Sequence, residues 1–150
     1  MTLWAPGDTI DDVSINGTWT AYTPTVVAGS GGFALGDGTL IGRWADWGKL
    51  VAFSLRLTFG ASTALGTGAT YLFGLPVARD MAVDMVFAAI LNDASASTAG
   101  YRTASGFSYN AQDFGIITHE GTTGKFVAPA VPWTWAVGDI IRVSGTYVRA

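Results

Sequence analysis

Alternation of apolar and polar residues with a period of two is the dominant pattern in this chain. The clearest stretch runs from Lys49 to Phe59, where every odd position after Lys49 is Val, Leu or Phe and the even positions are smaller or more polar. Successive side chains of a β-strand point to opposite faces, so the pattern predicts a strand with its odd face in the core. Its even face is only partly polar, and we expect that side to be covered as well.

Similar segments recur along the rest of the chain, and turn residues separate them. Helix-forming stretches are nearly absent because Gly, Thr and β-branched residues interrupt every window of three turns. The sequence therefore predicts an all-β fold, an antiparallel β-sandwich of jelly-roll type. The predicted strands, besides the one above, are Thr18–Ala28, Thr39–Asp46, Ala69–Val77, Met85–Leu91, Gly100–Tyr109, Phe114–Glu120 and Ile140–Arg149.

Glycines mark the turns between these strands. Asp46-Trp47-Gly48 predicts a hairpin turn that joins two antiparallel strands, and Val137-Gly138-Asp139 predicts a turn before the last strand. The run Ala34–Thr39 is echoed thirty positions later by Ala64–Ala69. Because nothing that flanks the two runs matches, we interpret the echo as the same turn chemistry used twice.

The chain divides into an N-terminal attachment arm, residues 1–15, and a β-sandwich domain, residues 16–150. The arm has little apolar content, which is typical of a segment that becomes ordered on a partner. Its candidate attachment residues are Trp4, Pro6, Asp8 and Ile10. It has neither the basic residue nor the apolar run of a secretory signal, and no stretch of the chain predicts insertion into a membrane.

Charge is scarce throughout the sequence. Only 13% of the residues are charged, against about 25% in average soluble domains. The net charge of −3 argues against a nucleic-acid partner. Apolar runs such as Ala88–Leu91, Ile140-Ile141 and Val26-Val27 suit strands that are covered on both faces. We therefore expect a homo-oligomer, with a homotrimer as the favoured arrangement.

Catalytic and metal-binding patterns are weak. The single histidine, His119, would need a distant partner such as Asp113 or Asp139 to build a triad. One histidine and no cysteine do not make a conventional zinc site. The one carboxylate pair worth testing for glycoside hydrolysis is Asp113 with Glu120. The sequence thus predicts a protein that is not an enzyme and that has no metal and no cofactor.

Aromatic residues are the strongest candidates for contact with a partner. Trp133 and Trp135 share one face of an extended segment and are expected to fill one end of the core. Trp47, expected in a hairpin turn, is a candidate contact residue. Alternation places Tyr101, Phe107 and Tyr109 on one face, opposite Arg102 and Ser108, as a second candidate surface for a sugar ring or a protein pocket. Coverage of these aromatic residues by a neighbouring subunit is the competing interpretation.

Several phrases, in this order, carry a resemblance to a known family. The chain resembles the β-rich domain of minor tail and fibre-like structural proteins of tailed bacteriophages, especially those of actinobacterial hosts. The resemblance starts at the lead Pro6–Ile10 and is weakest between Met81 and Lys125. Its phrases are Trp19–Thr25, Leu35–Trp44, Gly48–Val51, Leu57–Gly60, Thr67–Tyr71, Leu75–Ala78 and Gly138–Tyr147.

This resemblance implies a non-enzymatic virion component, usually homotrimeric, that is made in the host cytoplasm. Its partners would be copies of itself, other virion proteins and a glycan or protein of the host cell surface. The favoured function is a tail-tip or fibre-like module that contributes to host adsorption. Two alternatives stay open. One is a capsid decoration protein, and the other is a small glycan-active enzyme that assists entry.

Overall fold

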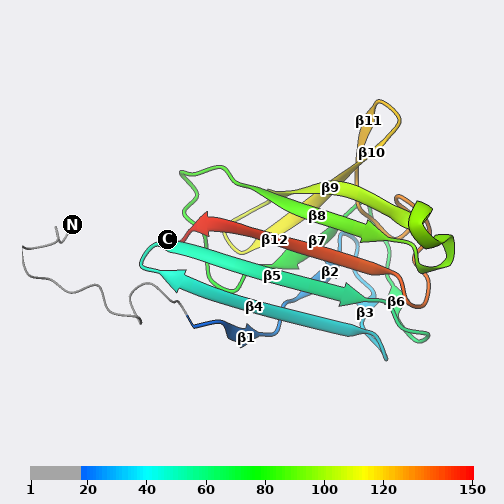
Figure 1. Ribbon diagram of the computed structural model, residues 1–150, viewed down its shortest axis with the longest axis horizontal. Coiled ribbons are helices and arrows are strands. Elements are labelled where there is room, and N and C mark those ends of the chain that lie inside the picture. The colour runs from blue at the N-terminus through cyan, green and yellow to red at the C-terminus, as the bar shows by residue number, and fades with distance from the viewer. Residues whose placement is uncertain (1–17) are drawn as a thin grey trace, which may run out of the picture.

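The computed structural model describes residues 18–150, and it shows an all-β fold (Figure 1). One short 3-10 segment, η1 (Ala94–Gly100), joins β8 to β9. The all-β, antiparallel prediction is confirmed, whereas the strand order does not establish a jelly roll. The strands are β1 (Thr20–Tyr22), β2 (Val26–Ala28), β3 (Phe33–Ala34), β4 (Thr39–Trp47), β5 (Leu50–Thr58), β6 (Ala64–Leu65), β7 (Tyr71–Gly74), β8 (Val86–Asn92), β9 (Tyr101–Ser108), β10 (Asp113–Glu120), β11 (Thr123–Phe126) and β12 (Ile140–Val148).

Ten of the strands form one antiparallel sheet in the order β1-β4-β5-β12-β8-β9-β10-β7-β2, with β11 added to β10. The sheet curls, so that β10, β7 and β2 lie behind β4, β5, β12 and β8 in Figure 1. Its two edges, β1 and β2, are joined by only Thr23, Pro24 and Thr25. The prediction of a single strand from Thr18 to Ala28 is therefore wrong. Proline has no backbone N–H to donate, and the chain crosses there from one edge of the sheet to the other.

The core fills the inside of the curl. The odd positions of β5, Val51 to Leu57, and the following Phe59 are buried, as their alternation predicts. Phe53 packs its ring against Phe87 at 4.9 Å and Phe114 at 5.5 Å between centroids. Trp135 stacks on Phe59 at 4.8 Å and closes one end of the core, and Trp133 packs beside it. The prediction for the two tryptophans is confirmed.

The two echoed runs lie side by side. They begin in β3 and β6, which pair with each other in the register Phe33↔Leu65 and Ala34↔Ala64. Each strand is followed by a glycine with positive φ, Gly36 at 60° and Gly66 at 72°, which L-residues rarely adopt. The prediction of the same turn chemistry is therefore confirmed only for this first glycine. Gly38 closes a turn by donating to the Leu35 carbonyl at 3.0 Å, whereas Gly68 has φ 127° and the residue before it bonds to the 30–31 loop.

A buried carboxylate fastens the end of the molecule that Trp135 closes. Asp139 is 1% exposed, and its side chain accepts three N–H hydrogen bonds. The donors are the indole Nε1 of Trp133 at 3.0 Å, the backbone of Ala136 at 2.9 Å and the backbone of Ala94 at 2.8 Å. Asp139 thereby ties the turn before β12 to η1, which is 45 residues away in the sequence.

Candidate interaction surface

The convex side of the strands β4, β5, β12, β8 and β9 is exposed in the described chain and faces the viewer in Figure 1. We call this side the outer face. The apolar run Ala88–Leu91, expected to be covered on both sides, alternates there, because Ala89 and Leu91 are buried while Ala88 and Ile90 are exposed. Large apolar side chains are exposed to solvent on this face. Val86 is the most exposed of them, with 74% of its surface accessible. Exposed apolar patches of this kind mark interaction sites.

Three arginines gather on the outer face. Arg56 of β5 is directly opposite Arg142 of β12 in the strand register, and Arg43 of β4 is opposite Ser54, one diagonal step from Arg56. Directly opposite side chains are about 5 Å apart at Cβ, and diagonal ones about 7–8 Å. Arg43 and Arg56 are exposed and Arg142 is half-buried. We call these three residues the arginine cluster.

No acidic side chain balances this cluster within residues 18–150. The outer positions of the five strands carry no Asp or Glu. The two ion pairs found among the described residues use other cations, namely Lys125 with Glu120, and Arg149 with Asp46 at 2.7 Å. A small hollow of about 240 Å³ opens beside Arg142, between Ser54, Ser144 and Ile90. The surface therefore offers cations, hydroxyls and apolar side chains to a partner.

The structure spreads the predicted aromatic contact residues over the molecule. Tyr101 and Tyr109 are both 56% exposed, but Tyr101 begins β9 and Tyr109 follows its end. Phe107 shares the outer face with Tyr101, about 20 Å along the strand, and packs its ring on Phe126 at 5.4 Å. The predicted aromatic strip is thus two separate exposed tyrosines. Arg102 lies on the opposite face, as expected, and covers the ring of Trp133 at 5.6 Å.

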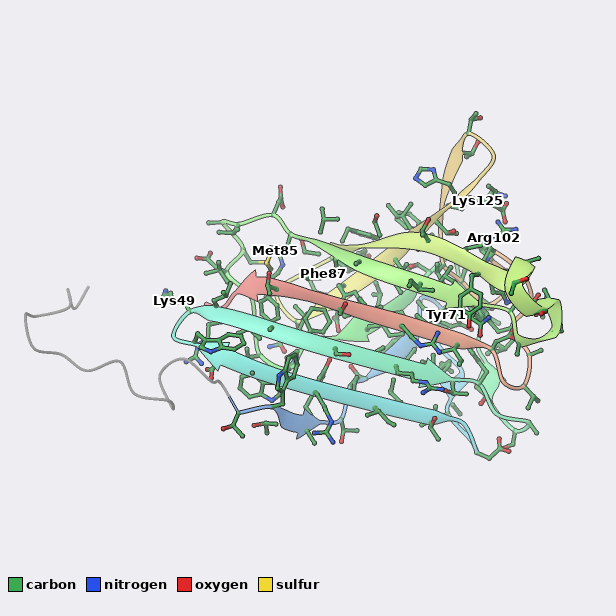
Figure 2. The ribbon with its side chains drawn as sticks, in the orientation of Figure 1. Lys49, Tyr71, Met85, Phe87, Arg102 and Lys125 are labelled. Carbon is green, nitrogen blue, oxygen red and sulfur yellow. The ribbon has the colours of Figure 1, made fainter. Side chains whose placement is uncertain are left out.

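Trp47 does not lie in the hairpin turn, so that part of the prediction is wrong. The turn is made by Gly48 and Lys49, and glycine occupies the first position with φ +67°. Trp47 is the last residue of β4 and is half-buried. Figure 2 shows Lys49 at this end of the molecule, and Arg102 and Lys125 toward the other. The attachment arm, with Trp4, Pro6, Asp8 and Ile10, lies outside the described residues.

A second hollow lies beside the β10–β11 hairpin, which projects from the body in Figure 1. Its volume is about 660 Å³, and its walls are mostly apolar or backbone. The lining comes from the loop 66–69, from β11 with Phe126, and from the loop 128–131 with Pro129. Lys125 lies at the hollow with its ammonium paired to Glu120. That ion pair, through its hydrogen bond and charge, lowers the pKa of Glu120.

The residues considered for catalysis do not come together. Asp113 and Glu120 begin and end β10, about 24 Å apart along the strand, whereas glycoside hydrolysis needs carboxyls within about 10 Å. The Asp113 carboxylate accepts a hydrogen bond from the Asn110 amide at 2.9 Å, and Asp139 holds the three structural N–H groups. His119 is exposed on β10. Among residues 18–150, no three His, Cys, Asp or Glu side chains are grouped as a metal site would require.

In the described part of the chain, no helix reaches the length and apolar character of a membrane span. No protein-family model, no curated protein and no solved structure matches this chain.

Proposed function

We propose that this chain is a non-enzymatic structural protein of a tailed-bacteriophage virion. In this proposal it is a tail-tip or fibre-like module, a homotrimer held to its neighbours by the N-terminal arm, and it contributes to host adsorption. The starting point is the sequence resemblance described above. The fold adds support, because an all-β body with a wide exposed face suits binding rather than turnover.

The distribution of the resembling phrases over the sheet is the observation that carries this proposal. Trp19–Thr25, Leu35–Trp44, Gly48–Val51 and Gly138–Tyr147 are far apart in the sequence, yet they fall on β1, β4, β5 and β12. These four strands are consecutive neighbours in the sheet. Of the other phrases, Leu57–Gly60 includes the end of β5, whereas Thr67–Tyr71 and Leu75–Ala78 lie at the two ends of β7, near the other edge. Five of the seven phrases therefore fall on one half of the sheet.

The part with the weakest resemblance forms a different region. Residues 81–125 supply β8, β9, β10 and most of β11, and they carry the exposed Tyr101 and Tyr109. We infer that the β1-β4-β5-β12 half is the scaffold of the module and that residues 81–125 hold its specific contacts. Exposed tyrosines suit this use, since one ring can stack on a sugar or fill a protein pocket.

Two experiments test the proposal. Antibody labelling of separated tails and heads locates the protein, and we expect the tails to be labelled. Labelled heads would favour capsid decoration. A label on neither part would overturn a virion role. Purified chain should also compete with phage for host cells. Tyr101→Ala with Tyr109→Ala should weaken this competition, while Trp19→Ala, at a similarly exposed aromatic residue directly before β1, should not. Equal competition by all three proteins would remove residues 81–125 as the contact region.

A further inference from the structure

The excess negative charge of this chain comes entirely from residues 1–17. The sequence has eleven acidic and eight basic side chains, and three of the acidic ones are Asp8, Asp11 and Asp12. All eight basic side chains lie in residues 18–150, where the other eight acidic ones balance them. The N-terminal segment is thus purely acidic, and the body is neutral as a whole.

Within the neutral body, positive charge is concentrated on the outer face. The arginine cluster has no ion pair or hydrogen bond to another described residue, although Arg149 and Lys125 both have carboxylate partners. Like charges directly opposite each other across two strands are destabilising, and Arg56 and Arg142 are placed in this way. A bound anion would relieve this repulsion, so the cluster is built to receive negative charge.

The direction of β1 favours a segment that comes from another copy of the chain. β1 pairs Thr20 with Trp44 and Tyr22 with Gly42, so the chain before Thr20 runs toward the Trp47 end of β4. Arg56 is instead level with Ile41. From the level that Thr18 would hold in this register, Arg43 is about 11 Å away and Arg56 about 20 Å away, both back toward the other end of β4. Asp8, Asp11 and Asp12 are six to ten residues before Thr18, so a segment of the same copy meets the cluster only if the chain reverses direction, whereas a second copy can present its segment from another direction.

We propose that Asp8, Asp11 and Asp12 of one copy bind the arginine cluster of a second copy. The inference rests on the attachment role proposed for the N-terminal arm, and it names the partner as another copy of this chain. Each copy gives a segment and receives one, so the contact is heterologous. Three such contacts in a ring would produce the expected homotrimer. Exposed ion pairs of this kind are screened by salt, so the assembly should weaken as ionic strength rises.

Charge reversal on each side of the contact provides the test. One protein carries Arg43→Glu, Arg56→Glu and Arg142→Glu, and the other carries Asp8→Lys, Asp11→Lys and Asp12→Lys. At low salt and micromolar concentration, sedimentation should show the unaltered chain at a multiple of 15.6 kDa. Each variant alone should associate about tenfold more weakly or worse. The mixture of the two should assemble more strongly than either variant alone, because a segment of one variant then meets a face of opposite charge on the other. A ring of three has at most two such matched contacts, so the recovery should be partial.

Lys49→Glu is the matched control, since Lys49 is an exposed cation in the β4–β5 turn outside the cluster, and it should assemble like the unaltered chain. Circular dichroism of every variant verifies that it is folded. Variants that assemble normally, or a mixture that associates no more strongly than either variant alone, would overturn the proposal. A monomeric unaltered chain whose binding to poly-aspartate requires the cluster would also overturn it and would assign the cluster to an external anion. Virion labelling tests the proposed function separately, because it does not depend on this contact.

Discussion

The carboxylate of Asp139 is expected to make a large contribution to folding, because it is buried and accepts three hydrogen bonds. Replacement by alanine removes one acceptor from three donors, Trp133 Nε1, Ala136 N and Ala94 N. A buried donor left without a partner costs about 1–3 kcal/mol. Trp133 is only half-buried and can turn partly toward water, which lowers its share. We therefore expect Asp139→Ala to reduce the free energy of unfolding by about 3–5 kcal/mol.

Urea unfolding followed by tryptophan fluorescence measures this loss. If the free energy of unfolding falls with urea concentration at the same slope in both proteins, they expose the same surface area on unfolding and their stabilities can be compared. Asp139→Asn should lie between the two proteins, because its amide oxygen can serve one side of the site while its NH2 faces donors on the other. Asp113→Ala is the control. Its carboxylate accepts a single side-chain hydrogen bond, from the Asn110 amide, and its loss should cost about 1 kcal/mol or less. A cost for Asp139→Ala that is no larger than this control would refute the argument.

Three further predictions follow from the core and from the titrating groups. Phe53→Ala should lower the free energy of unfolding in urea by about 3–5 kcal/mol, because the ring is buried in the core. Ser54→Ala on the outer face should change it by less than about 0.5 kcal/mol. Equal changes for the two variants would mean that the register of β5 is misassigned. The backbone N–H and the hydroxyl of Ser62 lower the pKa of Asp37, so the stability from this carboxylate is present above its ordinary pKa of 3.8 and is lost as the pH falls through the lower folded value. Ser62→Ala should raise the pKa of Asp37 in a carboxyl NMR titration. An unchanged pKa would contradict the assignment. Burial raises the pKa of Tyr147 to about 12, so the stability from its neutral phenol should be complete below pH 10 and lost as the pH rises through 12. The difference in phenolate absorbance between the folded chain and Tyr147→Phe measures the ionisation of Tyr147. Ionisation near pH 10 would contradict the raised pKa.

Period-two alternation was sufficient to predict most of the sheet. It works for β5 because one side of that strand faces a core and the other faces solvent, which is the condition that produces the pattern. It fails for Thr18–Ala28, where the residues of β1 and of β2 both have an extended pattern. Only their pairing shows that they are two strands, because β1 pairs with β4 and β2 pairs with β7. β11, Thr123–Phe126, was missed because all four of its residues are exposed and no alternation is imposed on them.

The candidate surface depends on information that one sequence does not contain. Alternation alone puts Arg43, Arg56 and Arg142 on polar positions of three predicted strands. Their proximity follows only from the order β4-β5-β12 and from the register of each pair. The role of Asp139 also depends on the fold. Its hydrogen-bond donors Trp133 and Ala136 are close in the sequence, but its third donor, Ala94, is 45 residues away and is brought near only by the fold. The position of Trp47 was misjudged by one residue, since the turn uses Gly48 and Lys49.

The place of β12 in the sheet has a consequence for how the molecule forms. β12 follows every other described strand in the sequence, yet it lies between β5 and β8. It pairs with β5 over Ile140–Val148 and with β8 over Ile140–Ser144. Until Ile140–Val148 leave the ribosome, β5 and β8 each have one open edge, and the two halves of the sheet have no strand to join them. Such contacts are distant in sequence, which favours slow and late folding. A nascent chain of this protein therefore presents two unpaired, leucine- and isoleucine-bearing edges, and protection of these edges during synthesis would govern its yield.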